Sequence, residues 1–418
     1  MSYLTGASLE VLHLILYNVD QQSDLYQCAL VNKSLYAATS PLLWREPKLL
    51  ARGTKRKDSI SFWLLRSFRQ ARIHGLHATS LGHYIRTLSI RRCTTLQDMR
   101  QVINNVPLVE ELVIDISTLK DKDMERIAIK CPQLKRLSLR FLTDGSDRFF
   151  EPLRHCTNLR ELSIIKVHRS LNHLKSLKHS GLEKLTVHSY YCFDEISLGL
   201  TFGNIPALTH LDMAAMTEAY FRHYQTLPSP TLFPGLTDLR IAMPHHTTTA
   251  DDAVVSFFKA HPLICTLSIK GMIIDPVIMT SLASDLVHLK RLSFINNGHL
   301  PPLTKSLPLV EKLTVRDCHM NVDSTVRMAM HLPNIHYIHV GKYVYSSRHF
   351  NRNFVGDILQ ANGPTVESRT HLTHLDFASH DSVPGDLMVY LPRRMDGKLI
   401  QEDLERIRKT ALGLVWID

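Results

Sequence analysis

One hydrophobic pattern recurs along most of the chain. It consists of an apolar residue, two variable residues, a second apolar residue, one variable residue and a third apolar residue. Twelve matches begin at positions 85, 109, 134, 159, 182, 208, 236, 264, 289, 310, 335 and 372. Their first positions are spaced 21 to 37 residues apart. A period of this length is typical of a solenoid, in which each unit buries its apolar edge against its neighbours.

Each period predicts one strand and one helical return. The last two apolar positions of a match alternate with polar neighbours, which is the periodicity of a strand with one buried face. Between the strands the spacing becomes helical: Met124, Ile127 and Ala128 stand at i, i+3 and i+4, and a similar run begins at Val254. A generic α/β fold would also alternate strands and helices, but it would not keep a constant period of twenty-odd residues.

The repeats resemble those of the leucine-rich repeat family over about residues 80 to 380. The segment Leu134–Leu139, preceded by Cys131-Pro132-Gln133, is close to the cysteine-containing type found in F-box proteins. Cys93 and Cys318 match the second cysteine position of that type. The resemblance implies an α/β fold: a right-handed leucine-rich-repeat solenoid, or horseshoe, with about twelve parallel strands.

The first fifty residues have a different character. Residues 8–16 predict a short helix with Ser8 as its N-cap, and its apolar residues cover more than one face. Asp24-Leu25 begins a second helix. Leu35 begins a third, which we expect to end at Ser40-Pro41 because proline disfavours a helix interior. A short helix that is apolar on two faces has to bury one of them against another surface.

This segment resembles an F-box. The motifs that carry the resemblance, in order and at the family's spacing, are Glu10-Val11-Leu12, Asp24-Leu25, Val31-Asn32-Lys33 and Leu43-Trp44-Arg45. Ala7-Ser8 stands where the family has Leu-Pro. The resemblance implies docking to a Skp-type adaptor and, through it, to a cullin scaffold. The residues expected to bind the adaptor are Leu9, Glu10, Val11, Leu12, Ile15, Leu16, Leu25, Leu30, Val31, Leu43 and Trp44. The alternative is that these helices only cap the open end of the solenoid.

The chain is thereby predicted to have four parts. The N-terminal three-helix F-box spans 1–50, a linker and N-terminal cap helix span 51–82, the solenoid spans 83–380, and a C-terminal cap spans 381–418. Within the cap helix, Phe62, Leu65 and Phe68 are expected on the core side.

The polar residues of the strands predict a binding surface. In such a solenoid the strands line the concave side, so the residues that flank the apolar positions face the cavity. The alternation of Glu111, Arg136, Glu161 and Lys184 predicts a ladder of cross-strand ion pairs. The concave-face residues expected to bind a substrate are Arg91, Arg140, Ile165, His188, Arg240, Lys270, Ile295, Arg316 and His339.

One row of this surface supports a hypothesis about the target. The positions after the last apolar residue combine cations with an apolar centre, which suits an acidic or phosphorylated peptide with a hydrophobic anchor. Charge reversal at Arg91, Arg140 and Arg316 together is then expected to abolish target capture.

Composition narrows the function further. A net charge of +10 and a pI near 9.2 invite a nucleic-acid interpretation, but the basic residues are spread along the chain. Apolar runs stay well below the roughly 18 residues of a membrane helix, and the N-terminus has no secretory pattern. The seven cysteines form no CxxC pairs, which is typical of a reducing compartment, so we expect a cytoplasmic or nuclear protein.

The chemistry-bearing motifs are missing from the sequence. It has no phosphate-cradling glycine loop, nucleophile elbow or zinc-spaced cluster, so we expect no enzyme and no cofactor. The prediction is a substrate-recognition subunit of a Skp–cullin–F-box ubiquitin ligase, which holds a target for ubiquitination and ubiquitin-dependent degradation by raising its effective concentration. Two alternatives stay open: a non-degradative scaffold, and a basic repeat protein that binds RNA through the loop near Tyr345.

Overall fold

The computed structural model of the chain describes the parts on which the following account rests. These are residues 8–47, 60–74, 80–90, 94–140, 146–167, 176–177, 179, 181–189, 205–214, 221–222, 225, 233–247, 251–319, 328, 331–340, 374–377 and 387–390. The chain divides into two compact units, one of residues 1–191 with 200–205 and one of residues 192–199 with 206–418. Each unit is considered by itself.

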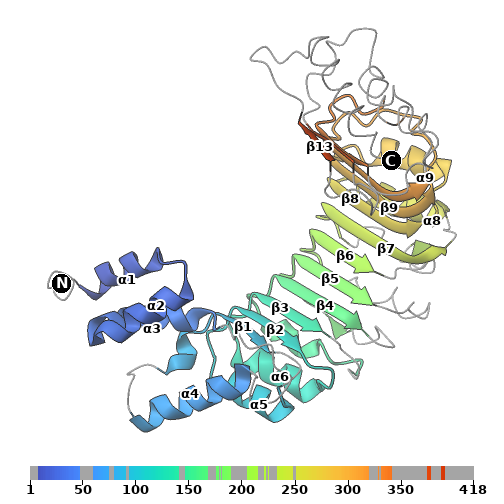
Figure 1. The fold of residues 1–418 in the computed structure, drawn as a ribbon. Coiled ribbons are helices and arrows are strands. Elements are labelled where there is room, and N and C mark those ends of the chain that lie inside the picture. Colours follow the sequence, from blue (N-terminus) through green and yellow to red (C-terminus); the bar gives the residue numbers. More distant parts are fainter. Residues whose placement is uncertain are drawn as a thin grey trace, which may run out of the picture. The chain divides into compact units, whose positions relative to one another are not determined.

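The first unit contains five parallel strands. They are β1 (Thr87–Ile90), β2 (Glu111–Asp115), β3 (Arg136–Arg140), β4 (Glu161–Val167) and β5 (Lys184–Ser189). Each strand pairs with the next one along the chain, and equivalent repeat positions face each other, as in Leu88 with Leu112 and Leu112 with Leu137. The predicted parallel α/β repeat is confirmed in this unit (Figure 1).

Helical returns cover one face of these strands. They are α4 (Ile60–His74), the 3-10 helix η2 (Leu81–Tyr84), α5 (Leu96–Ile103), α6 (Asp121–Lys130) and the 3-10 helix η3 (Glu151–His155). The second and fourth residues of each strand point into the core between strands and helices, where Leu88, Ile90 and Ile114 are fully buried. Cys131 and Cys156 fill the same layer as small apolar groups.

Three helices precede the first repeat: α1 (Leu9–Tyr17), α2 (Gln22–Val31) and α3 (Lys33–Arg45). Ser8 caps α1 as predicted, with its hydroxyl accepting from the amide of Val11 at 3.4 Å. The side chain of Asn32 caps α3 by accepting from the amide of Leu35 at 2.8 Å. The three helices share a small core of Leu12, Leu16, Leu25 and Ala38. Around it pack Val19, Cys28, Leu35, Leu42 and Leu43.

The prediction that α3 ends at Ser40-Pro41 is wrong. The helix continues through Pro41 to Arg45. Proline cannot donate to the preceding turn, but two buried hydroxyls bond to carbonyls of that turn. The hydroxyl of Thr39 donates to the carbonyl of Leu35 at 2.7 Å, and that of Ser40 donates to the carbonyl of Tyr36 at 2.7 Å.

The helix α3 contacts both α4 and the first repeat. The ring centroids of Trp44 and Phe68 lie 6.5 Å apart, and the amide of Arg86 donates to the carbonyl of Arg45 at 2.9 Å.

The expected core side of α4 needs a correction. Phe68 is buried as predicted, but its buried partners are Ile60, Ser61 and Leu64, whereas Phe62 and Leu65 are only half-buried. The core face of α4 is therefore rotated by about one residue from the prediction.

The second unit repeats the same design. Its parallel strands are β6 (His210–Ala214), β7 (Asp238–Thr247), β8 (Thr266–Met272), β9 (Arg291–His299), β10 (Lys312–His319), β11 (Tyr337–Val340) and β12 (His374–Phe377). Helices α8 (Asp251–Ala260) and α9 (Pro276–Asp285) lie on one side of them (Figure 1). The strand β13 (Leu387–Tyr390) falls in the predicted C-terminal cap and pairs antiparallel with β12.

Local chemistry fixes the ends of the longer strands of this unit. Gly271 has a φ of +74°, and a Cβ there would lie 2.4 Å from the carbonyl oxygen of Met243, so only glycine fits. The buried amide of Asn297 accepts from the backbone N–H of Met272 at 3.1 Å and donates to the carbonyl of Ile269 at 2.9 Å. It thereby bonds the end of one repeat to the next. In the part of the chain that is described, every helix is too short or too polar to cross a bilayer.

Candidate protein-interaction surfaces

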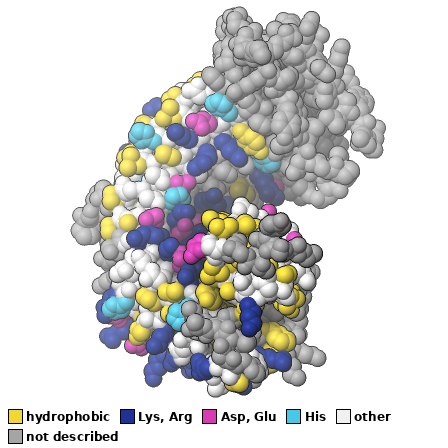
Figure 2. Space-filling model, turned by 90° about the vertical axis from the view of Figure 1, so that its left-hand side faces the viewer, with side chains coloured by type: hydrophobic (Ala, Val, Ile, Leu, Met, Phe, Trp, Pro, Cys, Tyr) yellow, Lys and Arg dark blue, Asp and Glu magenta, His cyan; other side chains and the backbone are white. Residues whose placement is uncertain are grey.

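The helices α1–α3 expose many apolar side chains. Nine large apolar or aromatic residues between positions 9 and 36 are 37–68% exposed, and we call them the N-terminal apolar surface: Leu9, Val11, Leu14, Ile15, Tyr17, Tyr26, Leu30, Val31 and Tyr36. Figure 2 looks at the side on which these helices lie in Figure 1 and shows apolar side chains gathered near the middle of the view. Apolar exposure of this density on one small element marks a site of interaction.

The structure divides the residues predicted to bind an adaptor into three groups, which are exposed, buried and half-buried. Five of the apolar ones belong to the N-terminal apolar surface: Leu9, Val11, Ile15, Leu30 and Val31. Glu10 is also exposed, and hydrogen bonds from its own backbone amide and from Ser8 lower its pKa.

Leu12, Leu16 and Leu25 do not lie on the surface. They are 1%, 3% and 8% exposed and hold the three helices together, so the prediction that they contact a partner is corrected to a core role. Leu43 and Trp44 are half-buried at the junction with the first repeat. The prediction missed Leu14 and Tyr17, although their apolar character on the far side of α1 was a readable signal.

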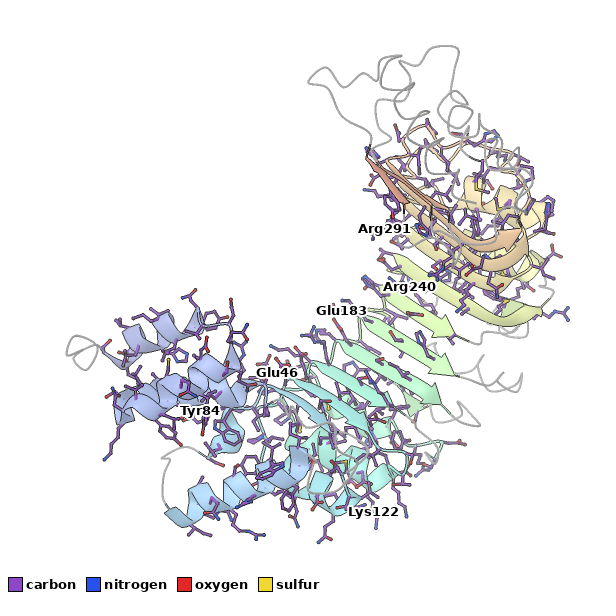
Figure 3. All side chains as sticks on the ribbon, viewed as in Figure 1. Glu46, Tyr84, Lys122, Glu183, Arg240 and Arg291 are labelled. Carbon is purple, nitrogen blue, oxygen red and sulfur yellow. The ribbon has the colours of Figure 1, made fainter. Side chains whose placement is uncertain are left out.

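The exposed strand face is the second candidate surface. We use this name for the first, third and fifth residues of the strands, which alternate with the buried positions and point away from the helices. In Figure 3, Arg240 and Arg291 lie on this side of the second unit, whereas Lys122 of α6 lies on the helical side of the first.

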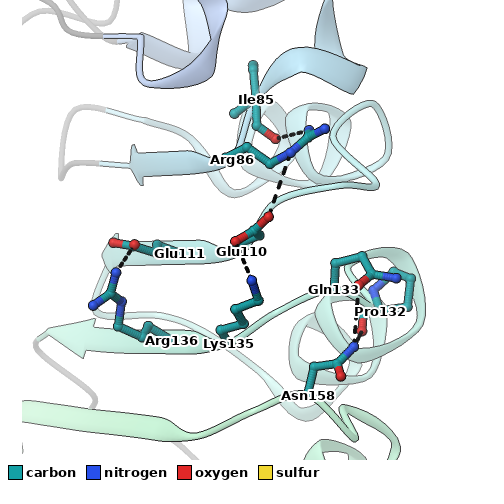
Figure 4. Close-up of polar contacts among 9 residues, drawn as sticks. All are labelled: Ile85, Arg86, Glu110, Glu111, Pro132, Gln133, Lys135, Arg136 and Asn158. Carbon is teal, nitrogen blue, oxygen red and sulfur yellow. Dashed lines mark hydrogen bonds and ion pairs between the residues drawn. The ribbon is translucent and has the colours of Figure 1, made fainter.

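In the first unit, acidic and basic side chains of the exposed strand face form ion pairs with one another. The guanidinium of Arg136 donates to the carboxylate of Glu111, and Lys184 Nζ lies 3.0 Å from Glu161 Oε1, which confirms the predicted ladder (Figure 4 shows the first pair). The hydrogen bond to Glu111 raises the pKa of Arg136.

A second ladder runs through the residues just before the strands. Glu110 lies between Lys135, whose Nζ is 2.7 Å from Oε2, and Arg86, whose Nε is 3.7 Å from Oε1 (Figure 4). The hydrogen bond from Lys135 is the main cause that lowers the pKa of Glu110. Arg160 and Glu183 continue the ladder at 3.4 Å. Sequence reasoning did not identify this row.

The predicted substrate-binding residues of the first unit are adjacent. Arg140, Ile165 and His188 face one another across β3, β4 and β5 in the strand register. Arg91 lies outside the described residues.

In the second unit the predicted residues again form a row. Lys270, Ile295 and Arg316 are register neighbours across β8, β9 and β10. Arg240 stands in the central row of β7, with its guanidinium 4.0 Å from Asp212, and His339 occupies the same row of β11. The predicted substrate-binding residues did not include Arg291 and Lys312, which flank the other side of these strands.

The described part of the chain contains no cluster of metal-ligating side chains, and three of its cysteines are buried. Within it, no group of three or more His, Cys, Asp or Glu side chains is arranged to hold a metal ion. Burial raises the pKa of Cys131 to about 12 and the pKa values of Cys156 and Cys318 to about 11, so these thiols stay protonated and unreactive.

Comparison with known proteins gives only distant likenesses. No family model matches the chain, and no curated protein matches it. Among solved structures, the yeast complex of Rad7 and Elc1 has a TM-score of 0.40 at 15% identity, covering 83% of this chain and 96% of the other. An internalin of Listeria monocytogenes has a TM-score of 0.41 at 12% identity, with coverages of 75% and 86%. The mouse RP105/MD-1 complex has a TM-score of 0.41 at 18% identity, with coverages of 63% and 44%. Likenesses at this level carry no argument about function.

Proposed function

We propose that this protein is a non-catalytic receptor subunit of a Skp–cullin–F-box type ubiquitin ligase. Helices α1–α3 act as an F-box that docks a Skp-type adaptor, and the exposed strand face holds the target protein for ubiquitination. The chain contributes proximity and orientation and forms no bond itself. Its place of work in this proposal is the cytoplasm or the nucleus.

The observation that carries the proposal is the N-terminal apolar surface. The core of α1–α3 is already filled by Leu12, Leu16, Leu25 and Ala38, yet Leu9, Ile15 and the other members of that surface stay in water. A cap that only sealed the first repeat would turn its apolar side chains toward that repeat. Exposed apolar residues on short helices instead suit insertion into a partner's groove.

The test separates docking from folding. Ile15 and Val31 are 50% and 67% exposed, so the double variant Ile15→Asp/Val31→Asp adds charge to the surface and leaves the small core untouched. The matched control is Ile129→Asp, because Ile129 is 62% exposed on α6 and lies outside the N-terminal helices. Each full-length variant is used to purify partners from cells, and the adaptor and cullin are quantified.

The proposal requires that the wild type and Ile129→Asp recover adaptor and cullin and that the double variant recovers neither. If the wild type recovers neither, α1–α3 only cap the solenoid. If adaptor and cullin bind but no protein accumulates when this chain is removed from cells, the complex is a scaffold without turnover.

A further inference from the structure

The strands β8, β9 and β10 carry an unusual set of exposed residues. Each contributes three residues to the exposed strand face, which are Thr266, Ser268, Lys270, Arg291, Ser293, Ile295, Lys312, Thr314 and Arg316. Four of the nine are cations, and the central residue of each strand carries a hydroxyl group. The one isoleucine is half-buried.

The register places the cations on both sides of a hydroxyl row. Lys312 pairs with Arg291 on one side, and Lys270 and Arg316 flank Ile295 on the other. Neighbouring strands lie about 4.8 Å apart, so the backbones at Lys270 and Arg316 are roughly 10 Å apart. Residues four apart along a strand are separated by about 13 Å, which is the width between the two cationic rows. The small hydroxyl side chains between them allow a polypeptide backbone to approach the sheet.

Nearby carboxylates balance only part of this charge. Arg291 lies 3.6 Å from Asp238 and donates to the hydroxyl of Thr266 at 2.9 Å. Arg316 lies 3.5 Å from Asp317. Among the described residues, two carboxylates thus pair with the four cations, which leaves a surplus of two positive charges.

The first unit provides an internal comparison. The charged residues on the exposed face of its strands β2 to β5 are three carboxylates and three Lys or Arg cations, namely Glu111, Asp115, Glu161, Arg136, Arg140 and Lys184. Those charges are equal in number, and four of them form the ion pairs described above. The strands β8–β10 therefore carry a cationic surplus that β2–β5 lack, so it does not follow from the basic composition alone.

We propose that the exposed strand face of β8–β10 binds an extended acidic segment of a partner polypeptide. Its carboxylates reach Lys270 and Arg316, and an apolar side chain between them contacts Ile295. Side chains of an extended chain alternate between its two faces, so two acidic residues four apart and an apolar residue midway between them all face the sheet. Their backbones span about 13 Å, and the long Lys and Arg side chains cover the difference from the roughly 10 Å between the two cations. The binding stands by itself, and only the identity of this partner as a ubiquitination target rests on the proposed function.

The composition of the face favours a peptide over RNA. Proteins that bind single-stranded RNA combine cations with aromatic rings on which bases stack. The nine exposed residues of β8–β10 include no aromatic side chain. The ring of Tyr337 on the neighbouring strand β11 is covered by Lys312, whose Nζ lies 4.3 Å from its centroid.

The experiment measures peptide binding to the purified full chain by fluorescence anisotropy. The probe is a short labelled peptide with two glutamates four residues apart and a leucine midway between them, in a glycine-serine context. A second peptide replaces the glutamates with lysines, and a third probe is a labelled oligouridine. The test variant is Lys270→Glu/Arg316→Glu. The control, Lys259→Glu/Lys305→Glu, makes the same change in net charge at exposed positions outside the strands of the same unit.

We expect the acidic peptide to bind the wild type and the control with affinities equal within about twofold, and to bind the test variant at least about tenfold more weakly. Equal binding of the acidic and lysine peptides, or unchanged binding to the test variant, would overturn the proposal. So would tighter binding of oligouridine that is lost in the test variant, which assigns the face to nucleic acid. Adaptor recovery by the same variants is measured in parallel: its absence with peptide binding intact refutes the ligase proposal and leaves this one standing.

Discussion

Arg100 in the last turn of α5 and Asp123 in the first turn of α6 form an ion pair across two consecutive repeats. Arg100 Nε lies 2.5 Å from Asp123 Oδ1, and the Asp123 side chain is 1% exposed whereas that of Arg100 is 38% exposed. The same carboxylate accepts from the backbone amide of Lys120 at 3.1 Å and so caps α6. The hydrogen bond to Asp123 raises the pKa of Arg100. One buried carboxylate therefore fixes both the start of α6 and its packing against α5.

This arrangement predicts a graded loss of stability. Asp123→Ala removes the cap and the ion-pair partner of the partly exposed Arg100, so we expect a cost of about 1–3 kcal/mol. Asp123→Asn keeps an acceptor for the amide of Lys120 and should cost less. Urea unfolding, together with hydrogen exchange of the α6 amides, measures both. An equal loss for the two variants would show that the charge, and not the cap, carries the effect.

A matched pair on α1 separates the core from the docking surface. Leu12 is 1% exposed and Leu9 is 51% exposed on the same helix. Leu12→Ala opens a cavity in the core of α1–α3 and should cost about 2–4 kcal/mol, whereas Leu9→Ala should cost less than about 1 kcal/mol. Hydrogen exchange of the α1–α3 amides reports the difference. Similar deprotection in the two variants would contradict the assigned core.

His261 makes the second unit sensitive to acid. It is buried, its ring centroid lies 4.2 Å from that of Phe257, and its Nδ1 is 2.7 Å from the Phe257 carbonyl oxygen. Burial lowers its pKa from the ordinary value of 6.5. The unfolded chain then binds the proton more readily than the folded chain, so stability is lost as the pH falls below about 6.5.

The variant His261→Gln keeps a side-chain amide donor but does not titrate, so we expect a flatter dependence of stability on pH below 6.5. His288→Gln, at an exposed histidine, is the control and should leave the pH profile unchanged. Denaturant midpoints measured from pH 7 to pH 5 compare the three proteins. An identical slope for His261→Gln and the wild type would remove His261 as the cause.

The cysteines should differ in reactivity. Burial raises the pKa of Cys131 to about 12, while Cys28 and Cys265 are only partly buried. Because the thiolate is the reactive form, iodoacetamide should label Cys28 and Cys265 in the folded protein well before Cys131, Cys156 and Cys318. Peptide mapping by mass spectrometry gives the order, and urea should equalise the rates. Early labelling of Cys131 in the folded protein would contradict its place in the core.

Local pattern predicted much of the architecture. The alternation in segments such as Leu137–Leu139 located β3 and the side of it that is buried, because a strand has a period of two whatever its partners are. Equal repeat spacing then predicted which residues meet across strands, and the pairs Glu111–Arg136 and Glu161–Lys184 confirmed it. At Pro41 the local rule failed, because the hydroxyls of Thr39 and Ser40 bond to the carbonyls of the preceding turn.

By itself the sequence determined the repeat, the parallel strands and the rows of polar residues, since these follow from the periods of strand and helix. Only the tertiary structure decided which apolar residues of α1 and α2 are core and which remain exposed, because α3 is what covers Leu12 and leaves Leu9 in water. The tertiary structure also decided which part of the exposed strand face carries a surplus of positive charge. Whether a cation such as Arg291 is balanced depends on carboxylates such as Asp238, which is 53 residues away in the chain and 3.6 Å away in space. Electrostatic balance depends on that distance in space, and no pattern along the chain specifies it.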